Sequence, residues 1–182
     1  QKSSQPFAMV ISWGTPHDPW NDGNVPAEYR EKFAGVSLPH SPNYKPANDP
    51  YADAWARLSD SERADLEKWR RNYYAMTTNL DWNFGRLMKY LDDNGLADNT
   101  IVVFSSDHGE MFGAQGRRAK NIFYDEAARI PMLVRWPGKI QAGQVSDACM
   151  STVDFMPTFL GLLGLSVPSR VEGMNLSHLA LG

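Results

Sequence analysis

Apolar residues gather along the chain in short runs that are typical of strands. The runs 7–13 and 100–104 are too short for an average helix and rich in β-branched or aromatic residues, which predicts two buried strands. A third run, 131–136, begins at a proline, and proline is tolerated at the first position of a strand. The pattern therefore predicts three strands separated by long intervening segments.

One long stretch, 59–94, has the periodicity of an amphipathic helix. Ser59 and Glu62 have the spacing of a capping box, which satisfies two backbone donors at a helix start. Gly95 supplies the left-handed residue that commonly ends a helix. Apolar residues between these ends recur at three- and four-residue steps and predict one core-facing stripe: Leu66, Trp69, Tyr73, Met76, Leu80, Phe84, Leu87 and Leu91.

Two further helices and one long loop complete the predicted organisation. The helices are expected at 123–129 and at 151–165, the second with Thr152 as its cap. Residues 21–53 lack periodicity, and their aromatic residues predict a packed excursion over the active face of the molecule. Strands that alternate with helices predict an α/β fold, with a mainly parallel, incomplete sheet flanked by helices, in a single domain over residues 1–182.

Composition narrows the function classes. A net charge of −3 gives no reason to expect nucleic acid or an anionic membrane as a partner. No stretch approaches the roughly 20 apolar residues that span a bilayer. The single cysteine, Cys149, excludes an internal disulfide and a cysteine-based zinc cluster, and we expect it to be a buried structural thiol.

Chemistry-bearing residues follow the predicted strands directly. Asp107 and His108 come after the second strand, and His17 follows the first on a loop held between Pro16 and Pro19. Ligands of open α/β sheets bind beyond the carboxyl ends of the strands. These side chains are therefore candidates for one site.

The segment 109–121 adds glycine and positive charge to this region. Its glycines indicate an irregular loop that can approach a ligand closely. Arg117, Arg118 and Lys120 suit an anionic group beside a metal ion, or else they neutralise local acids. The sequence lacks the His-Glu-x-x-His motif of zinc proteases. It also lacks the Gly-x-Ser-x-Gly turn that carries the nucleophile of many serine hydrolases. Metal-assisted hydrolysis of an anionic ester fits these residue types best.

An ordered set of motifs resembles the sulfatases of the alkaline phosphatase superfamily. The run 98–110 is followed by Gly116, Lys120, Tyr124 and the sequence 129–131, in an order similar to that family. The turn 16–19 resembles the family's Pro-His-x-Pro turn, and the helical stretch 73–87 resembles its long core helix. The resemblance covers most of residues 7–165.

This resemblance implies a type I sulfatase, which cleaves sulfate esters with calcium and a formylglycine made from cysteine or serine. Asp107 would be a calcium ligand, and His108 would lie in the next metal-site position or hydrogen-bond to the sulfate. Lys120 would contact sulfate oxygens. His17 would do the same and protonate the leaving alcohol. The substrate would be a sulfated small molecule or glycan, and the location periplasmic, secreted or lysosomal.

The chain departs from the family pattern at the nucleophile. The family's Cys/Ser-x-Pro-x-Arg motif and its paired calcium-binding aspartates are expected upstream of this chain, and Cys149 does not stand in such a motif. We therefore expect a fragment from the middle and later part of a catalytic domain, inactive alone. It should bind calcium weakly, with two of about six ligands at best. Exposed sheet edges invite association.

Two alternatives stay open beside the sulfatase. A phosphonate monoester or phosphodiester hydrolase would share these motifs and change only the ester. A non-catalytic module would bind sulfated glycans through His17, Arg117, Arg118 and Lys120 without turnover.

Overall fold

The computed structural model describes residues 5–181 and divides the chain into two compact units. The first unit comprises residues 1–87 and 108–129, and the second comprises residues 88–107 and 130–182. Each unit is described by itself below. That the whole chain forms a single domain stays a prediction.

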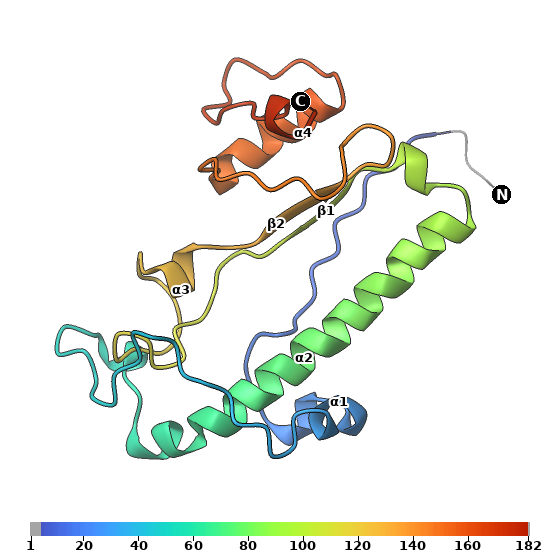
Figure 1. The fold of residues 1–182 in the computed structure, drawn as a ribbon. Helices are drawn as coiled ribbons and strands as arrows, with labels where there is room; N and C mark the ends of the chain where they lie inside the picture. The colour runs from blue at the N-terminus through green and yellow to red at the C-terminus, as the bar shows by residue number, and fades with distance from the viewer. Residues whose placement is uncertain (1–4, 182) are drawn as a thin grey trace. The chain divides into compact units, whose positions relative to one another are not determined.

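Most of the long helix α2 (Asp60–Asp93), up to Leu87, belongs to the first unit, and its last residues belong to the second (Figure 1). This helix confirms the one that the sequence predicts. The capping box forms as predicted, since the Ser59 N–H donates to Glu62 Oε2 at 2.8 Å and the Glu62 N–H to Ser59 Oγ at 3.3 Å. Helix α1 (Ala27–Glu31) lies beside α2, where Tyr29 packs against Met76. Shorter 3-10 turns flank these helices at Asp22–Asn24 (η1) and Ala54–Ala56 (η2).

The buried face of α2 includes polar residues that periodicity did not predict. Leu66, Met76 and Leu80 are buried as predicted. Arg70 is also buried and donates to the carbonyl of Leu38 at 3.0 Å. Asn72 donates to the carbonyl of Trp20 at 2.9 Å and to Asp22 Oδ1 at 3.1 Å. These polar side chains satisfy backbone carbonyls of the 20–40 segment and hold it against the helix.

The loop 109–121 packs against another segment of the same unit, residues 43–49. The N–H of Lys45 donates to Gly113 O at 3.1 Å, and the N–H of Asp49 donates to Gly116 O at 3.1 Å. A Cβ on Gly113 would lie 2.6 Å from the Tyr44 ring, and one on Gly116 would overlap the Ala47 carbonyl oxygen. The predicted close approach at these glycines is therefore made to the chain's own backbone. Residues 43–49 of the 21–53 loop are therefore packed, and the position of this loop over an active face stays a prediction.

The second unit contains the sheet, and its strand direction corrects the prediction. Strands β1 (Val102–Ser105) and β2 (Met132–Arg135) pair antiparallel, with Val103 opposite Val134 (Figure 1). A parallel pair requires a crossover, usually a helix. The segment between these strands contains only the short helix α3 (Asp125–Ala128), which lies within the helix predicted at 123–129. The prediction of a mainly parallel sheet is wrong for the described residues.

The predicted buried strand at 7–13 does not form. These residues have no regular secondary structure, and Met9 and Val10 are 70% and 95% exposed. A strand needs a hydrogen-bonded neighbour, and residues 5–181 supply none for this segment. The apolar pattern shows that this segment has the composition of a strand, but it cannot show whether a neighbouring strand is present to pair with it.

The rest of the second unit contains four short helical elements among its described residues. Its elements are the 3-10 turns Ala97–Asn99 (η3) and Thr152–Asp154 (η4), and the helices Phe155–Leu162 (α4) and His178–Leu181 (α5). The cap at the start of η4 is Ser151, one residue before the predicted Thr152. Asp154 accepts the N–H groups of Ser151 and Met174, both at 2.8 Å, and so ties the segment after Glu172 to the start of α4.

Two smaller findings complete the fold. Cys149 is exposed, so the prediction of a buried thiol is wrong; it lies in an irregular segment that packs no side chain over it. Within residues 5–181, no helix has both the length and the apolar character needed to cross a membrane.

Two glycines with the same backbone conformation give a matched test of the loop packing. Gly116 and Gly35 both have φ +70°, but a Cβ on Gly35 would meet nothing within 4 Å. Gly35→Ala should lower the free energy of unfolding by about 1–2 kcal/mol, the cost of the left-handed conformation. Gly116→Ala should cost about 1–3 kcal/mol more, because its Cβ overlaps backbone atoms. Urea denaturation measures both. Equal losses would contradict the packing described above.

Candidate active site

The loop 109–121 is closed by a carboxylate. Glu110 Oε1 accepts the backbone N–H of Ala119 and, at 3.5 Å, that of Phe112. The Met111 N–H donates to Ala119 O at 3.0 Å. Burial raises the pKa of Glu110, while the amide hydrogen bonds and the nearby Lys120 oppose this rise. Sequence reasoning gave Glu110 no such role, since no local pattern links residues nine positions apart.

Two of the three bases in this loop are neutralised by acids of the same unit. Arg117 Nε lies 2.6 Å from Asp49 Oδ2, with both side chains mostly buried. Arg118 pairs with Glu62 and donates to the Trp55 carbonyl at 2.9 Å. For these two arginines, the interpretation that they neutralise local acids agrees with the structure.

Lys120, the third base, lies next to His17. Lys120 Nζ is 2.9 Å from His17 Nε2, although 103 residues separate them in the sequence. His17 Nδ1 lies 2.6 Å from Asp18 Oδ1. In this arrangement Nε2 accepts from the lysine, so the neutral imidazole carries its proton on Nδ1 and donates it to Asp18. The peptide bonds before Pro16 and Pro19, which flank this histidine, are cis.

His108 belongs to the same unit and lies near His17. The two ring centroids are 6.4 Å apart in an edge-to-face arrangement. His108 Nδ1 is 2.8 Å from the carbonyl oxygen of Gly109, which fixes the proton on Nδ1 and the lone pair on Nε2 when the ring is neutral. The structure therefore brings together three of the predicted site residues, while their roles stay predictions.

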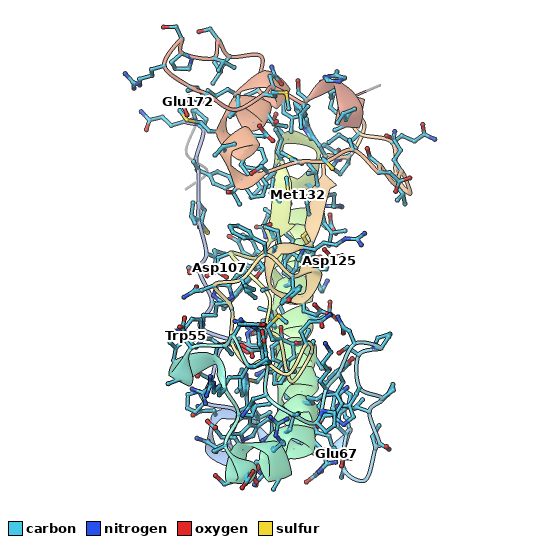
Figure 2. All side chains as sticks on the ribbon, turned by 90° about the vertical axis from the view of Figure 1, so that its left-hand side faces the viewer. Trp55, Glu67, Asp107, Asp125, Met132 and Glu172 are labelled. Atoms are coloured by element: carbon cyan, nitrogen blue, oxygen red, sulfur yellow. The ribbon has the colours of Figure 1, made fainter. Side chains whose placement is uncertain are left out.

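Asp107, the fourth predicted site residue, precedes His108 in the chain and belongs to the second unit (Figure 2). Its side chain is exposed, and the Ser106 hydroxyl lies 3.4 Å from Asp107 Oδ1.

The side chains of the described residues do not make a calcium site by themselves. Calcium takes six to eight oxygen ligands. Between residues 5 and 181, no group of three or more His, Cys, Asp or Glu side chains is arranged to hold a metal ion. Asp107 offers one carboxylate and His108 a nitrogen, so this donor set does not fit calcium unaided.

Comparison with known proteins decides the family. A family model described as Sulfatase matches residues 1–165. The chain belongs to the sulfatase family. Over 181 residues it is 38% identical to an ulvan-active sulfatase of Formosa agariphila, covering 98% of this chain and 32% of that protein. This family lies in the alkaline phosphatase superfamily, as the motifs implied.

Solved structures agree with this assignment. The YidJ protein of Bacteroides fragilis matches with a TM-score of 0.83 and 34% identity, covering 98% of this chain and 37% of that one. A protein solved with its substrate D-glucosamine-2-N,6-O-disulfate matches with a TM-score of 0.63 and 36% identity, covering 70% and 26%. The fold is thus sulfatase-like, and the chain spans about a third of the length of the relatives that it matches.

A phosphonate monoester hydrolase from Silicibacter pomeroyi is also similar. Its TM-score is 0.70 and its identity 27%, covering 86% of this chain and 34% of that one. The fold is therefore shared by proteins named for two different esters.

The Asp49–Arg117 pair predicts an acid-dependent stability. The amide of Tyr51 and the Arg117 guanidinium hold the pKa of Asp49 below its usual 3.8. The charged carboxylate therefore stabilises the fold above about pH 4, and this contribution is lost as the pH falls through the lowered pKa. Asp49→Asn should lower stability at neutral pH and flatten its change below pH 4, measured by urea denaturation across pH. Asp53→Asn, an exposed change nearby, should leave the curve unchanged. Parallel curves for Asp49→Asn and the unsubstituted protein would refute this.

The hydrogen bonds of Glu110 lead to a second prediction, on the free energy of unfolding of two Glu110 variants. Glu110→Ala should cost about 1–3 kcal/mol, because two loop amides lose their acceptor. Glu110→Gln keeps a carbonyl oxygen and should recover most of this loss. Hydrogen exchange of the Ala119 amide measures the loop directly, with fast exchange in the alanine variant alone. Fast exchange in both variants would show that charge, not hydrogen bonding, closes the loop.

Proposed function

We propose that the complete protein hydrolyses sulfate esters, with Lys120 binding the sulfate oxygens and His17 acting at the leaving oxygen. The observation that carries this proposal is the 2.9 Å approach of Lys120 Nζ to His17 Nε2. A sulfate monoester presents negative oxygens and a leaving oxygen on the same sulfur atom. A cation and an imidazole held this close suit both parts of such a group.

The geometry supports a division of roles between these side chains. The Lys120 ammonium neutralises charge on the non-bridging oxygens, while the charge that develops as the ester bond breaks falls on the leaving oxygen. The departing alkoxide needs a proton. His17 supplies it from Nε2 when the ring is protonated and Lys120 has turned from Nε2 to the sulfate oxygens. Asp18, at Nδ1, fixes the ring orientation and stabilises the imidazolium that carries this proton.

The nucleophile and the metal belong to the complete protein in this proposal. A formylglycine is expected outside this chain, and calcium is expected with Asp107 as a ligand and His108 beside it. We therefore propose activity for the complete protein and none for residues 1–182 alone. The proposed substrate is a sulfated sugar, which is the class named in the structure of one relative.

Two other functions were open, and the geometry bears on each differently. Phosphonate ester hydrolysis is favoured by one observation, the similarity to a phosphonate monoester hydrolase. Lys120 and His17 would serve either tetrahedral anion. The glycan-binding module loses support, because Arg117 and Arg118 are engaged by Asp49 and Glu62.

The first test compares esters in the complete protein. We expect kcat/KM for an aryl sulfate to exceed that for the matching aryl phosphonate monoester. The reverse order would transfer the assignment to phosphonate chemistry.

The second test separates the two side chains. His17→Ala should lower kcat about 10²- to 10⁴-fold for an alkyl or sugar sulfate, the usual range for a lost general acid. The loss should be much smaller for nitrophenyl sulfate, whose leaving group needs no proton. Lys120→Ala should lower kcat/KM for both. Lys139→Ala, an exposed lysine in the second unit, is the control. Equal losses for both leaving groups would rule out His17 as the acid.

A further inference from the structure

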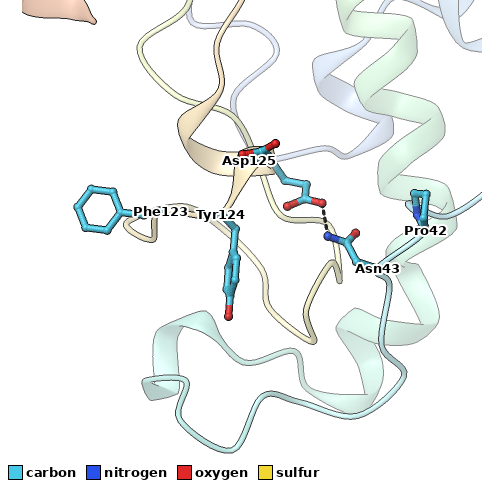
Figure 3. Close-up of a pocket in the computed structure, with 6 residues that line it drawn as sticks. Pro42, Asn43, Phe123, Tyr124 and Asp125 are labelled. Carbon is cyan, nitrogen blue, oxygen red and sulfur yellow. Dashed lines mark hydrogen bonds between the residues drawn. The ribbon is translucent and has the colours of Figure 1, made fainter. Parts of the chain in front are cut away.

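A hollow of ≈ 460 Å³ lies in the first unit, apart from Lys120 and His17. Its lining is Pro42, Asn43, Phe123, Tyr124, Asp125 and Glu126 (Figure 3). Residues 42–43 come from the excursion that packs against the loop 109–121, and residues 123–126 follow that loop in the chain. A volume of this order suits a small organic group such as one sugar ring.

Hydrogen bonds fix the floor of the hollow. Asn43 Nδ2 donates to Glu126 Oε1 at 2.5 Å, drawn as the dashed line in Figure 3. The Gly109 N–H donates to Ala127 O at 2.8 Å, and a Cβ on Gly109 would overlap the Glu126 carbonyl oxygen. The side of the hollow formed by Glu126 is therefore in contact with Gly109, the residue that follows His108. A group bound in the hollow would lie beside the segment that carries the candidate catalytic residues.

The lining combines aromatic faces with acids. Tyr124 is 39% exposed and Phe123 is 98% exposed, with the Phe123 ring pointing away from Pro42 and Asn43 (Figure 3). Aromatic faces pack against the C–H faces of sugar rings, and Tyr adds a polar hydroxyl. The carboxylates of Asp125 and Glu126 accept hydrogen bonds from hydroxyl groups. Their negative charges also repel a sulfate or carboxylate group on a sugar ring bound in the hollow.

We propose that this hollow binds a neutral, hydroxyl-bearing sugar ring linked to the sulfated ring of the substrate, and disfavours a ring that carries sulfate or carboxylate. The proposal rests on the proposed function and adds a specificity to it. Lys120 selects the anionic group, and the acids of the hollow select an uncharged neighbour. Tyr124 supplies the stacking face, and Asp125 supplies the charge that discriminates.

The experiment uses the complete protein and sulfated disaccharides that differ only in the unsulfated ring, a neutral hexose or the matching hexuronic acid. The unsubstituted protein should prefer the neutral member. Tyr124→Ala should raise KM for that member about 2- to 10-fold, as expected for one aromatic contact, and leave KM for nitrophenyl sulfate unchanged. Tyr124→Phe, the matched control, keeps the ring and should retain most of the affinity. Asp125→Asn should raise kcat/KM for the uronic acid member alone.

Three results would overturn the proposal. The first is an unchanged KM for the neutral disaccharide in Tyr124→Ala. The second is an unchanged preference in Asp125→Asn. The third is a loss of stability in Tyr124→Ala and Phe123→Ala with no change in KM, which would mark the hollow as a packing surface for another part of the complete protein.

Failure of the proposed function would have a different signature. In that case the complete protein would hydrolyse neither the disaccharides nor nitrophenyl sulfate. The hollow is then tested by saturation-transfer NMR with methyl cellobioside and its uronic acid counterpart. Binding of the neutral sugar alone, lost in Tyr124→Ala, supports the hollow as a sugar site, and absence of binding rejects it.

Discussion

The Glu110 carboxylate is enclosed by the loop that follows it, and the position of Lys120 depends on that contact. Its oxygen holds the Ala119 amide, and Ala119 adopts a left-handed conformation (φ +63°) that an alanine rarely takes without support. Lys120 is the next residue, so this turn sets the direction of its side chain. The packing of Gly113 and Gly116 against residues 43–49 anchors the outer part of the same loop. Two distant segments are therefore needed to place one ammonium group.

Charge pairing then determines which base is available to an anion. The arginines beside Lys120 are held by Asp49 and Glu62, so they serve the loop's structure. Lys120 instead lies against an exposed imidazole whose other nitrogen is held by a carboxylate. A run of positive charge that looks uniform in the sequence thus separates into two structural residues and one candidate functional residue.

Local patterns predicted the features that local physics controls. The capping box, the helix α2 and the strand β2 depend on spacing within a few residues, and all three formed. Segment order was also informative, since it led to the sulfatase family that the comparisons show. The buried strand at 7–13 and the parallel sheet failed because each depends on a partner strand that the pattern of one segment cannot specify. The Glu110–Ala119 and Asn43–Glu126 hydrogen bonds link residues 9 and 83 positions apart in the sequence. No hydrophobic periodicity connects such pairs.

The most direct measurement is a double-mutant cycle on Lys120 and His17 in the complete protein. Sugar sulfate hydrolysis would be compared in His17→Ala, Lys120→Ala and the double variant. If the two side chains act on one bound sulfate ester, the fold-loss of hydrolysis rate in the double variant should be far smaller than the product of the fold-losses in the two single variants. Losses that multiply would show that the residues act independently, and would contradict a shared active site at the 2.9 Å contact.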